Sequence, residues 1–456
     1  MNINNISQWT SQSHLLRILV LGFLAVALQI PIGSIENLMF ERQATQSSAQ
    51  SEVQQKWGNE QRIIGPLLVV PYKEQHLWTG AHGVTQSRFE TRRAVFLPDE
   101  FEGANELSNE TRYRGIFEVP LYQATTNLTG YFMKPDFRPW DVKDDDVLWD
   151  KARLVVLVSD ARAIQKQARI HWNDADYFFE PGTDDITPNR SGYHVNLPDI
   201  KNANGKMAFS IQLVLNGSKG IYMAPLGKDS LLKVTAPWPD PSFQGKWLPT
   251  SRKIDADGFS AQWQIPYLGR NFPQQTREFS STDENISNSL VGVDLITPVD
   301  SYRMTERSIK YETLFLVLTF AVIWLMEVLA KLRVHVVQYL FIGAGLCLFY
   351  LLELSLSEHL GFYWAYVVAT LAIVSVVSAY SYFVLQTGKR ATIIGVMLTG
   401  LYAYLFTLLQ EQNYSLLIGS ISLFVMLSAV MFITRNIDWH KLTPVPDLKP
   451  ETTEFT

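Results

Sequence analysis

The stretch Tyr311–Leu329 reads YETLFLVLTFAVIWLMEVL, and its charged side chains are Glu312 and Glu327. A helix needs about 20 mostly apolar residues to cross the hydrocarbon core of a bilayer, so this stretch predicts a transmembrane helix. Another apolar segment, Leu15–Ile32 (LLRILVLGFLAVALQIPI), lies near the start of the chain. Four more follow Tyr311–Leu329 with short links between them, at 336–354, 362–385, 391–410 and 414–434. The sequence therefore predicts a membrane protein with a six-helix transmembrane α bundle.

The composition agrees with this class of protein. Of the 456 residues, 47% are hydrophobic and 18% are charged, whereas roughly a quarter of residues are charged in a soluble globular protein. The formal net charge is -5 and no basic face or tail is visible, so we expect no nucleic-acid partner. The single cysteine, Cys347, lies in an apolar run, which excludes an intramolecular disulfide and a cysteine-based metal site. We expect no cofactor.

Short links between the apolar segments predict the orientation. Lysine and arginine stay on the cytoplasmic side of short loops. The links with basic residues alternate with links that lack them, and all of them therefore fall on one face of the membrane. The topology-setting residues are Lys331, Arg333, Lys389, Arg390, Arg435 and Lys441. This pattern puts residues 1–14 and 435–456 in the cytoplasm and residues 33–310 outside it. We expect the first segment to be an uncleaved anchor, because no small-residue cleavage site follows it.

Residues 33–310 show the alternation of half-buried strands. Aliphatic residues occupy the odd-numbered positions of 210–215, and apolar residues alternate with polar ones over 258–265. Residues 152–158 (ARLVVLV) form a more continuous apolar strand. The polar segment Ser34–Gly58 reads as a helical extension of the first transmembrane helix that ends in a stalk. We therefore predict a large β-rich, sandwich-like domain inserted after the first helix.

Candidate chemistry in this domain is sparse. His171, Asp174 and Asp176 are close enough in sequence to bind a cation, but a solvated turn explains them as well. The acidic run 144–146 lacks the glycine and the ligand spacing of a calcium loop. No nucleophile elbow, metalloprotease helix, P-loop or dinucleotide fingerprint occurs. We single out no catalytic residue and no metal ligand, and if the protein is an enzyme, His171 or His194 are the candidate participants.

The predicted bundle carries few ionisable groups. Glu312, Glu327 and Glu353 lie within about a turn of predicted helix ends, which favours interfacial positions over a proton path. Glu327 precedes Lys331 by four residues, the spacing of a surface ion pair. Small residues recur every four positions at Gly395, Thr399 and Ala403, which predicts a helix-packing face or a contact in a homo-oligomer.

Several short motifs spread over nearly the whole chain carry a family resemblance. They are Ile64-Gly65-Pro66-Leu67 with Val70-Pro71-Tyr72, Tyr113-Arg114-Gly115-Ile116-Phe117, Trp238-Pro239-Asp240-Pro241, Pro298-Val299-Asp300-Ser301-Tyr302 and Leu354-Ser355-Leu356-Ser357-Glu358-His359. With these motifs the chain resembles the CreD family of inner-membrane proteins of Gram-negative bacteria, named for cell-envelope integrity. The resemblance implies an inner-membrane location, a periplasmic domain and a role in envelope stress, and it supplies no catalytic residue.

The motif that begins at Trp238 contains a candidate recognition loop. Residues 238–249 hold three prolines and two tryptophans, which predicts a rigid stretch that is not a strand. Trp238, Phe243 and Trp247 are the residues that would contact lipid, glycan or protein. The alternative is a buried rigid corner that closes a sheet.

These observations leave three functions open. The sequence favours a non-enzymatic envelope protein that binds or scaffolds through its periplasmic domain, with the lipid bilayer and envelope proteins, lipid or glycan as partners. One alternative is a transporter or lipid-handling protein that uses the helix bundle. The other is a membrane enzyme that acts on envelope material.

Overall fold

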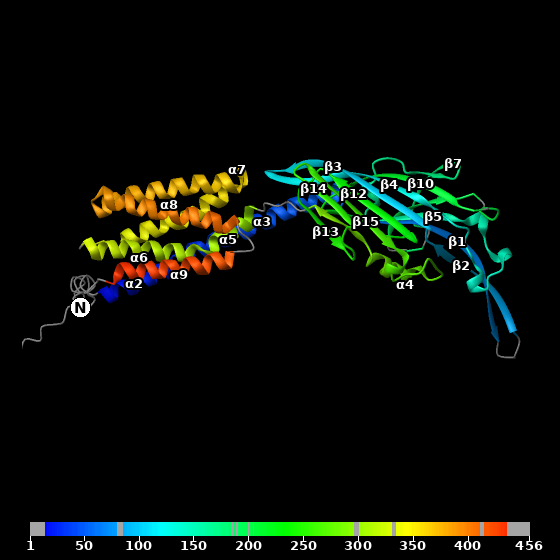
Figure 1. Ribbon diagram of the computed structural model, residues 1–456, viewed down its shortest axis with the longest axis horizontal. Helices are drawn as coiled ribbons and strands as arrows, with labels where there is room; N and C mark the ends of the chain where they lie inside the picture. Colours follow the sequence, from blue (N-terminus) through cyan, green and yellow to red (C-terminus); the bar gives the residue numbers. More distant parts are fainter. Residues whose placement is uncertain are drawn as a thin grey trace, which may run out of the picture. The chain divides into compact units, whose positions relative to one another are not determined.

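The computed structural model describes residues 14–79, 85–183, 186–187, 190–198, 200–203, 205–295, 301–330, 334–410 and 415–435. The chain divides into two compact units. The membrane unit comprises Met1–Gln46 and Val299–Thr456, and the β unit comprises Ser47–Pro298. Helices make up the membrane unit, and the strands all belong to the β unit (Figure 1).

The apolar segments of the sequence form the helices of the membrane unit. These helices are α2 (His14–Ala27), α3 (Gln29–Trp57, which continues into the β unit), α5 (Ser301–Lys310), α6 (Glu312–Ala330), α7 (Val336–Leu385), α8 (Gly388–Gln410) and α9 (Ser415–Thr434). Within the described residues, three helical stretches are long and apolar enough to cross a membrane, or four if the pair α5 and α6, bent by 43°, counts as one. Integration into a membrane by several helices is thus supported.

Helix α7 folds back on itself at Gly361. A straight helix would hold Phe341 and Tyr380 about 58 Å apart, yet their ring centroids are 6.2 Å apart. The rings of Phe349 and Tyr366 are 5.4 Å apart. Gly361 has φ 74° and ψ 161°, a left-handed conformation that glycine adopts without steric cost. The prediction that residues 355–361 form a loop is therefore wrong, because the helix continues to Leu360. The single residue Gly361 makes the turn between the two antiparallel halves of α7.

Two sheets make up the β unit (Figure 1). The nine-stranded sheet contains β1 (Gln61–Thr79), β2 (Thr85–Phe96), β5 (Arg153–Val158), β8 (Glu180–Pro181), β9 (Ser191–Asn196), β11 (Gly220–Met223), β13 (Pro241–Gly245), β16 (Gln275–Thr276) and β17 (Val291–Leu295). The eight-stranded sheet contains β3 (Glu100–Arg114), β4 (Phe117–Phe132), β6 (Arg169–Trp172), β7 (Ala175–Phe178), β10 (Met207–Gly217), β12 (Asp229–Ala236), β14 (Ser251–Asp255) and β15 (Gly258–Pro266). Pairing is antiparallel except for β1 with β11 and β3 with β12. One helix, α4 (Phe279–Ser287), follows the last of the long strands.

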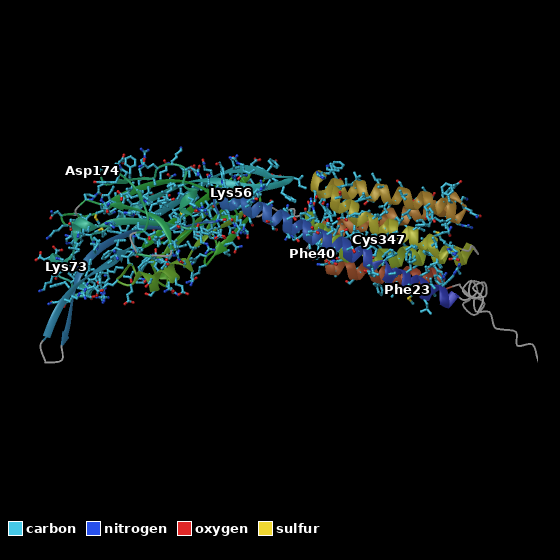
Figure 2. All side chains as sticks on the ribbon, turned by 180° about the vertical axis from the view of Figure 1, so that it is seen from behind. Phe23, Phe40, Lys56, Lys73, Asp174 and Cys347 are labelled. Atoms are coloured by element: carbon cyan, nitrogen blue, oxygen red, sulfur yellow. The ribbon has the colours of Figure 1, made fainter. Side chains whose placement is uncertain are left out.

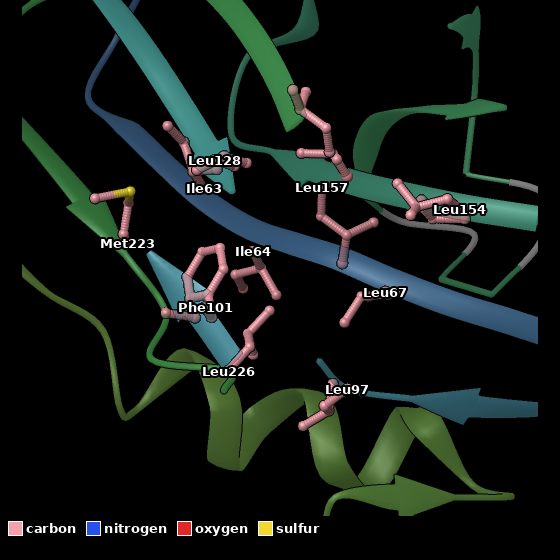
Figure 3. Packing of buried hydrophobic residues seen from close by; sticks show 14 of the residues in the cluster. Ile63, Ile64, Leu67, Leu97, Phe101, Leu128, Leu154, Leu157, Met223 and Leu226 are labelled. Atoms are coloured by element: carbon pink, nitrogen blue, oxygen red, sulfur yellow. The ribbon is translucent and has the colours of Figure 1, made fainter. Parts of the chain in front are cut away.

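The two sheets share one apolar core. Ile64 and Leu67 of β1, in the first sheet, belong to the same buried cluster as Phe101 of β3 and Leu128 of β4, in the second. Figure 3 shows these side chains packed together with Leu154 of β5. The cluster shows why both sheets are stable side by side: each buries its apolar face against the other.

The strand predictions from alternation are confirmed. Residues 210–215 lie in β10, where Ile211, Leu213 and Leu215 are at most 1% exposed. Residues 258–265 lie in β15, where Phe259, Ala261, Trp263 and Ile265 are buried and the residues that alternate with them are not. Residues 152–158 coincide with β5 and its preceding residue.

The compact β unit is narrower than the predicted domain 33–310. Met39 of α3 is 0% exposed and Ile35 is also buried, and both belong to the helical core rather than to the β core. Tyr302 and Ile309 of α5 belong to it as well. The start of α3 and helix α5 are polar in overall composition, but each has an apolar face that packs against other helices. Both segments therefore belong to the membrane unit.

Candidate functional site

A small pocket lies in the β unit between the end of α3 and the turns that follow β10 and β12. Its volume is about 160 Å³. The lining residues are Gln50, Gln54, Pro120, Leu121, Tyr122, Lys219, Trp238 and Leu295. It brings together residues from five stretches of the chain that are far apart in sequence.

The last two turns of α3 form one wall of this pocket. Trp57 at the helix end donates from Nε1 to the carbonyl oxygen of Tyr122 at 3.2 Å, and the guanidinium of Arg112 lies 4.8 Å from the centre of the Trp57 ring. Gln50 donates from Nε2 to the carbonyl oxygen of Glu118 at 3.3 Å. These contacts fix the helix against β4 and hold the amide groups of Gln50 and Gln54 at the pocket.

Backbone turns form the opposite wall. Lys219 adopts a φ of 63° between β10 and β11, and its carbonyl oxygen accepts a hydrogen bond from the Leu295 N–H at 2.7 Å. Beneath it, the hydroxyl of Tyr122 donates to the carbonyl oxygen of Gly220 at 2.7 Å. Burial raises the pKa of Tyr122 well above its usual range, so this hydroxyl remains a neutral donor. Trp238 follows β12, next to Pro237, whose carbonyl oxygen accepts a hydrogen bond from Asn109 at 2.6 Å.

The chemistry of the pocket suits part of a polar molecule. It offers two primary amides, an indole and, in Lys219, an exposed ammonium group. Sites for whole drug-sized ligands usually measure about 300–1,000 Å³. A volume of 160 Å³ has room for about five water molecules, or for one ring or one terminal group of a larger partner.

Of the three residues in the predicted recognition loop, the pocket contains Trp238. The expected non-strand stretch is wrong in its middle, because Pro241–Gly245 pair with β17 as strand β13 at a sheet edge. The Phe243 ring packs at 5.9 Å from Phe259 and 6.0 Å from Trp263, measured between centroids. The carbonyl oxygen of Trp247 accepts a hydrogen bond from Trp263 Nε1 at 3.0 Å. Phe243 and Trp247 therefore have the contacts of a rigid corner.

The histidine and aspartate candidates lie at the surface of the β unit. His171 Nδ1 and Asp176 Oδ1 are 2.8 Å apart across the hairpin of β6 and β7, and both side chains are more than half exposed. Asp174 is exposed in the turn between them (Figure 2). His194 contacts the Gly182 carbonyl oxygen at 3.1 Å. Among the described residues no group of three or more histidine, cysteine or acidic side chains could hold a metal ion.

Glu327 is buried between helices and does not form the exposed ion pair that its spacing from Lys331 predicts. Glu327 is 2% exposed and forms an ion pair with Arg17 of α2. It also accepts hydrogen bonds from the Val334 N–H at 3.1 Å and from the Tyr339 hydroxyl at 3.1 Å. The predicted partner Lys331 lies outside the described residues. Glu327 thus joins the first transmembrane segment to α6 and α7.

Glu312 and Glu353 are buried among helices as well. Glu312 is 2% exposed and accepts a hydrogen bond from Gln29 Nε2 at 3.1 Å. Glu353 is 0% exposed and lies inside α7, because the helix does not end at residue 354 as predicted. The sequence shows where an acidic residue lies along a helix, but it does not show which other helices pack around that residue.

The structure shows a further polar contact that the sequence did not predict. Arg42 of α3 binds Glu358 of α7 through two bonds, Nε to Oε1 and Nη2 to Oε2, each of 2.7 Å. The Tyr302 hydroxyl of α5 donates to the same carboxylate at 2.6 Å. Such bidentate arginine–carboxylate pairs fix geometry as well as adding energy. Arg42 and Glu358 are separated by 316 residues, so no local pattern could have indicated the pair.

The topology-setting residues are partly described. Lys331, Arg333 and Lys441 lie outside the described residues. Lys389 and Arg435 are exposed, and the guanidinium of Arg435 lies 3.9 Å from the centre of the Phe432 ring. Arg390 is half-buried and donates from Nη1 to the carbonyl oxygen of Leu385 at 3.2 Å. The membrane orientation that these residues predict stays a prediction.

The predicted packing face of α8 makes one close contact. A Cβ atom on Gly395 would lie 2.7 Å from the Ser378 hydroxyl oxygen of α7, so the glycine permits close approach. Thr399 and Ala403 are exposed. The buried face of α8 is a different one, and it contains Ala391, Ile394, Leu398, Tyr402, Leu405, Leu408 and Leu409. A contact of Thr399 and Ala403 with a second copy stays a prediction.

A protein family and one of its members match this chain over nearly its full length. The family described as "Inner membrane protein CreD" matches residues 13–440. The Inner membrane protein CreD of Escherichia coli (strain K12) is 30% identical over 426 residues, which cover 92% of each chain. Two crystal structures of an M1 zinc metallopeptidase from Deinococcus radiodurans, one of them a mutant with bound substrate, match with TM-scores of 0.21 and identities of 10% and 11%. They cover 44% of this chain and 42% and 41% of theirs, a likeness too low to carry an argument. The match over residues 13–440 and the identity to the Escherichia coli protein place this chain in the CreD family of inner membrane proteins.

Proposed function

We propose that the protein crosses the inner membrane six times, with both termini in the cytoplasm and the β unit in the periplasm. The basic residues of the short links support this orientation, because they fall after every second apolar segment. The antiparallel halves of α7 support two crossings by that helix. Labelling of single cysteines in intact cells tests the orientation: position 174 would react with an impermeant reagent and position 386 would not.

We further propose that the β unit binds envelope glycan, without catalysis, through the pocket at Trp238. The observation that carries this proposal is the pocket's lining. An indole face can stack on a sugar ring, the amides of Gln50 and Gln54 can exchange hydrogen bonds with hydroxyls, and Lys219 can pair with a carboxylate. An anionic sugar at the end or along a glycan strand is the ligand that uses all of these groups.

Trp238→Ala is expected to weaken the binding of such a sugar at least tenfold, about 1.4 kcal/mol. Lys219→Gln should weaken the binding of an anionic sugar and leave the binding of a neutral sugar unchanged, because the substitution removes the charge and keeps a polar side chain. The probes are a disaccharide that contains N-acetylmuramic acid and, as its neutral counterpart, chitobiose. Isothermal titration calorimetry on the full chain in nanodiscs measures both affinities.

Matched controls are Phe178→Ala, an aromatic side chain 58% exposed on another strand, and Lys166→Gln, an exposed lysine away from the pocket. Neither should change the affinity. Equal affinities of the wild type and Trp238→Ala, or turnover of the disaccharide by the wild type, would refute a non-enzymatic glycan site here.

The buried carboxyl groups bear on the alternative of transport. The sequence argued against a transporter because Glu312 and Glu353 were expected at the interface. Both are buried among helices, which is the arrangement that functional carboxyl groups of membrane proteins have. Transport through the bundle therefore remains the second candidate function.

A further inference from the structure

A fully buried carboxyl group lies between the helices of the membrane unit. Glu353 of α7 is 0% exposed. Its Oε2 accepts a hydrogen bond from the Ser308 hydroxyl of α5 at 2.9 Å. Its Oε1 has no hydrogen-bond partner among the described residues. Figure 2 marks Cys347, one and a half turns earlier on the same helix, among the helices of this unit.

The groups around Glu353 are polar but uncharged. Thr305 and Ser308 of α5 lie beside the carboxyl group, and Tyr350 lies one turn earlier on the same face of α7. Tyr366, from the second half of α7, and Tyr402 of α8 are within electrostatic reach. The hydroxyls of Thr305 and Tyr350 have no hydrogen-bond partner in the described part of the chain.

Nearby cations are engaged elsewhere. Arg307 of α5 donates to the carbonyl oxygens of Leu408 and Leu409 at 3.1 and 2.7 Å. Arg42 binds Glu358. Within the described residues, no lysine, arginine or histidine forms an ion pair with Glu353. Glu312 of α6 is also buried, and it accepts a hydrogen bond from the uncharged Gln29 side chain.

Burial without a cation decides the protonation state. An ionised carboxylate in an apolar interior is far more costly than a neutral acid, so a group in this position takes up a proton instead. The neutral acid also supplies an O–H donor, which the open Oε1 could direct to the Thr305 or Tyr350 hydroxyl. Glu327 differs in one respect: it is equally buried, but Arg17 compensates its charge.

We propose that Glu353 is a proton-binding site of the membrane unit, occupied at neutral pH. The ligand of the site is a proton. This proposal does not depend on the glycan pocket, which lies in the other unit.

Infrared difference spectroscopy of the full chain in nanodiscs tests the site, because a protonated carboxylic acid has a carbonyl-stretch band that a carboxylate lacks. Spectra recorded at neutral pH and again at alkaline pH should show the loss of this band in the wild type. Because Glu312 is also buried and its hydrogen-bond donor Gln29 is uncharged, Glu353→Gln should lose only the Glu353 component of the band at neutral pH, a component that Glu312→Gln keeps. Glu353→Gln should melt at the same temperature as the wild type, because the amide replaces a neutral acid. Glu327→Gln is the matched control: it should keep the band and lower the melting temperature.

Two results would overturn the proposal. One is a band that persists unchanged in Glu353→Gln, and the other is a Glu353→Gln variant as destabilised as Glu327→Gln, which would mean an ionised Glu353. If Glu353→Gln does not fold, Ser308→Ala tests instead whether the band belongs to Glu353. Loss of the hydrogen bond to Oε2 should shift the frequency of the band, and an unshifted band would contradict the assignment.

Discussion

Glu327→Ala is expected to destabilise the membrane unit by about 3 kcal/mol, at the lower end of the range for breaking a buried ion pair. The lower end applies because Arg17 keeps 20% of its side chain exposed. The substitution leaves the Arg17 guanidinium without its carboxylate and the Tyr339 hydroxyl without its acceptor. Because Glu327 connects α2, α6 and α7, we expect the whole helical unit to unfold more readily rather than one helix end to fray.

Thermal unfolding of the full chain in nanodiscs, followed by circular dichroism in the helical band, measures this effect. The matched control is Glu306→Ala. Glu306 also pairs with a cation, Lys310, but in an exposed pair four residues apart on one helix, which contributes only about 0.3–0.5 kcal/mol. If the two substitutions lowered the melting temperature equally, the pair of Glu327 with Arg17 would have no structural role.

Trp263→Ala is expected to destabilise the β unit by about 3–5 kcal/mol, the usual cost of removing a large buried aromatic side chain. Trp263 is 1% exposed in β15. It donates its indole N–H to Trp247 and packs edge to face against Phe243. The substitution would therefore leave a cavity and release the corner that β13 and Trp247 form at the edge of the unit.

Pulse proteolysis in increasing urea measures the stability of the β unit in the full chain. Phe178→Ala serves as control, because an aromatic ring that is 58% exposed should change stability by no more than about 0.5 kcal/mol. A Trp263→Ala variant as resistant as this control would show that the corner is not part of the core.

The sequence predicted those features that local patterns encode. Alternation identified β15 with its buried Trp263, and hydropathy identified the apolar helices, because both signals depend on neighbours within a few residues. The contacts of Arg17 with Glu327 and of Arg42 with Glu358 join residues more than 300 positions apart. No periodicity reports such a pair, so the sequence did not predict that these carboxyl groups are buried between helices.

Of the residues that line the candidate pocket, only Trp238 was predicted from the sequence. Trp238 was conspicuous because prolines follow it, and it does line the pocket. Gln50, Tyr122 and Lys219 come from a helix, a strand and a turn with unremarkable sequences. Phe243 was wrongly placed in a loop because the two prolines near it disfavour a central strand. The structure resolves this conflict by placing β13 at the edge of its sheet.

The orientation of the β unit is tested most directly with the full-length chain in intact cells. Because Cys347 is the only cysteine, Cys347→Ser provides a background without thiols. On it, Asp174→Cys places a thiol on the exposed hairpin of the β unit, and Gln386→Cys places one at the exposed end of α7. A membrane-impermeant maleimide should label Asp174→Cys in intact cells and Gln386→Cys only after the inner membrane is permeabilised. Labelling of Gln386→Cys in intact cells, with Asp174→Cys protected until permeabilisation, would contradict a periplasmic β unit and with it an envelope-binding function.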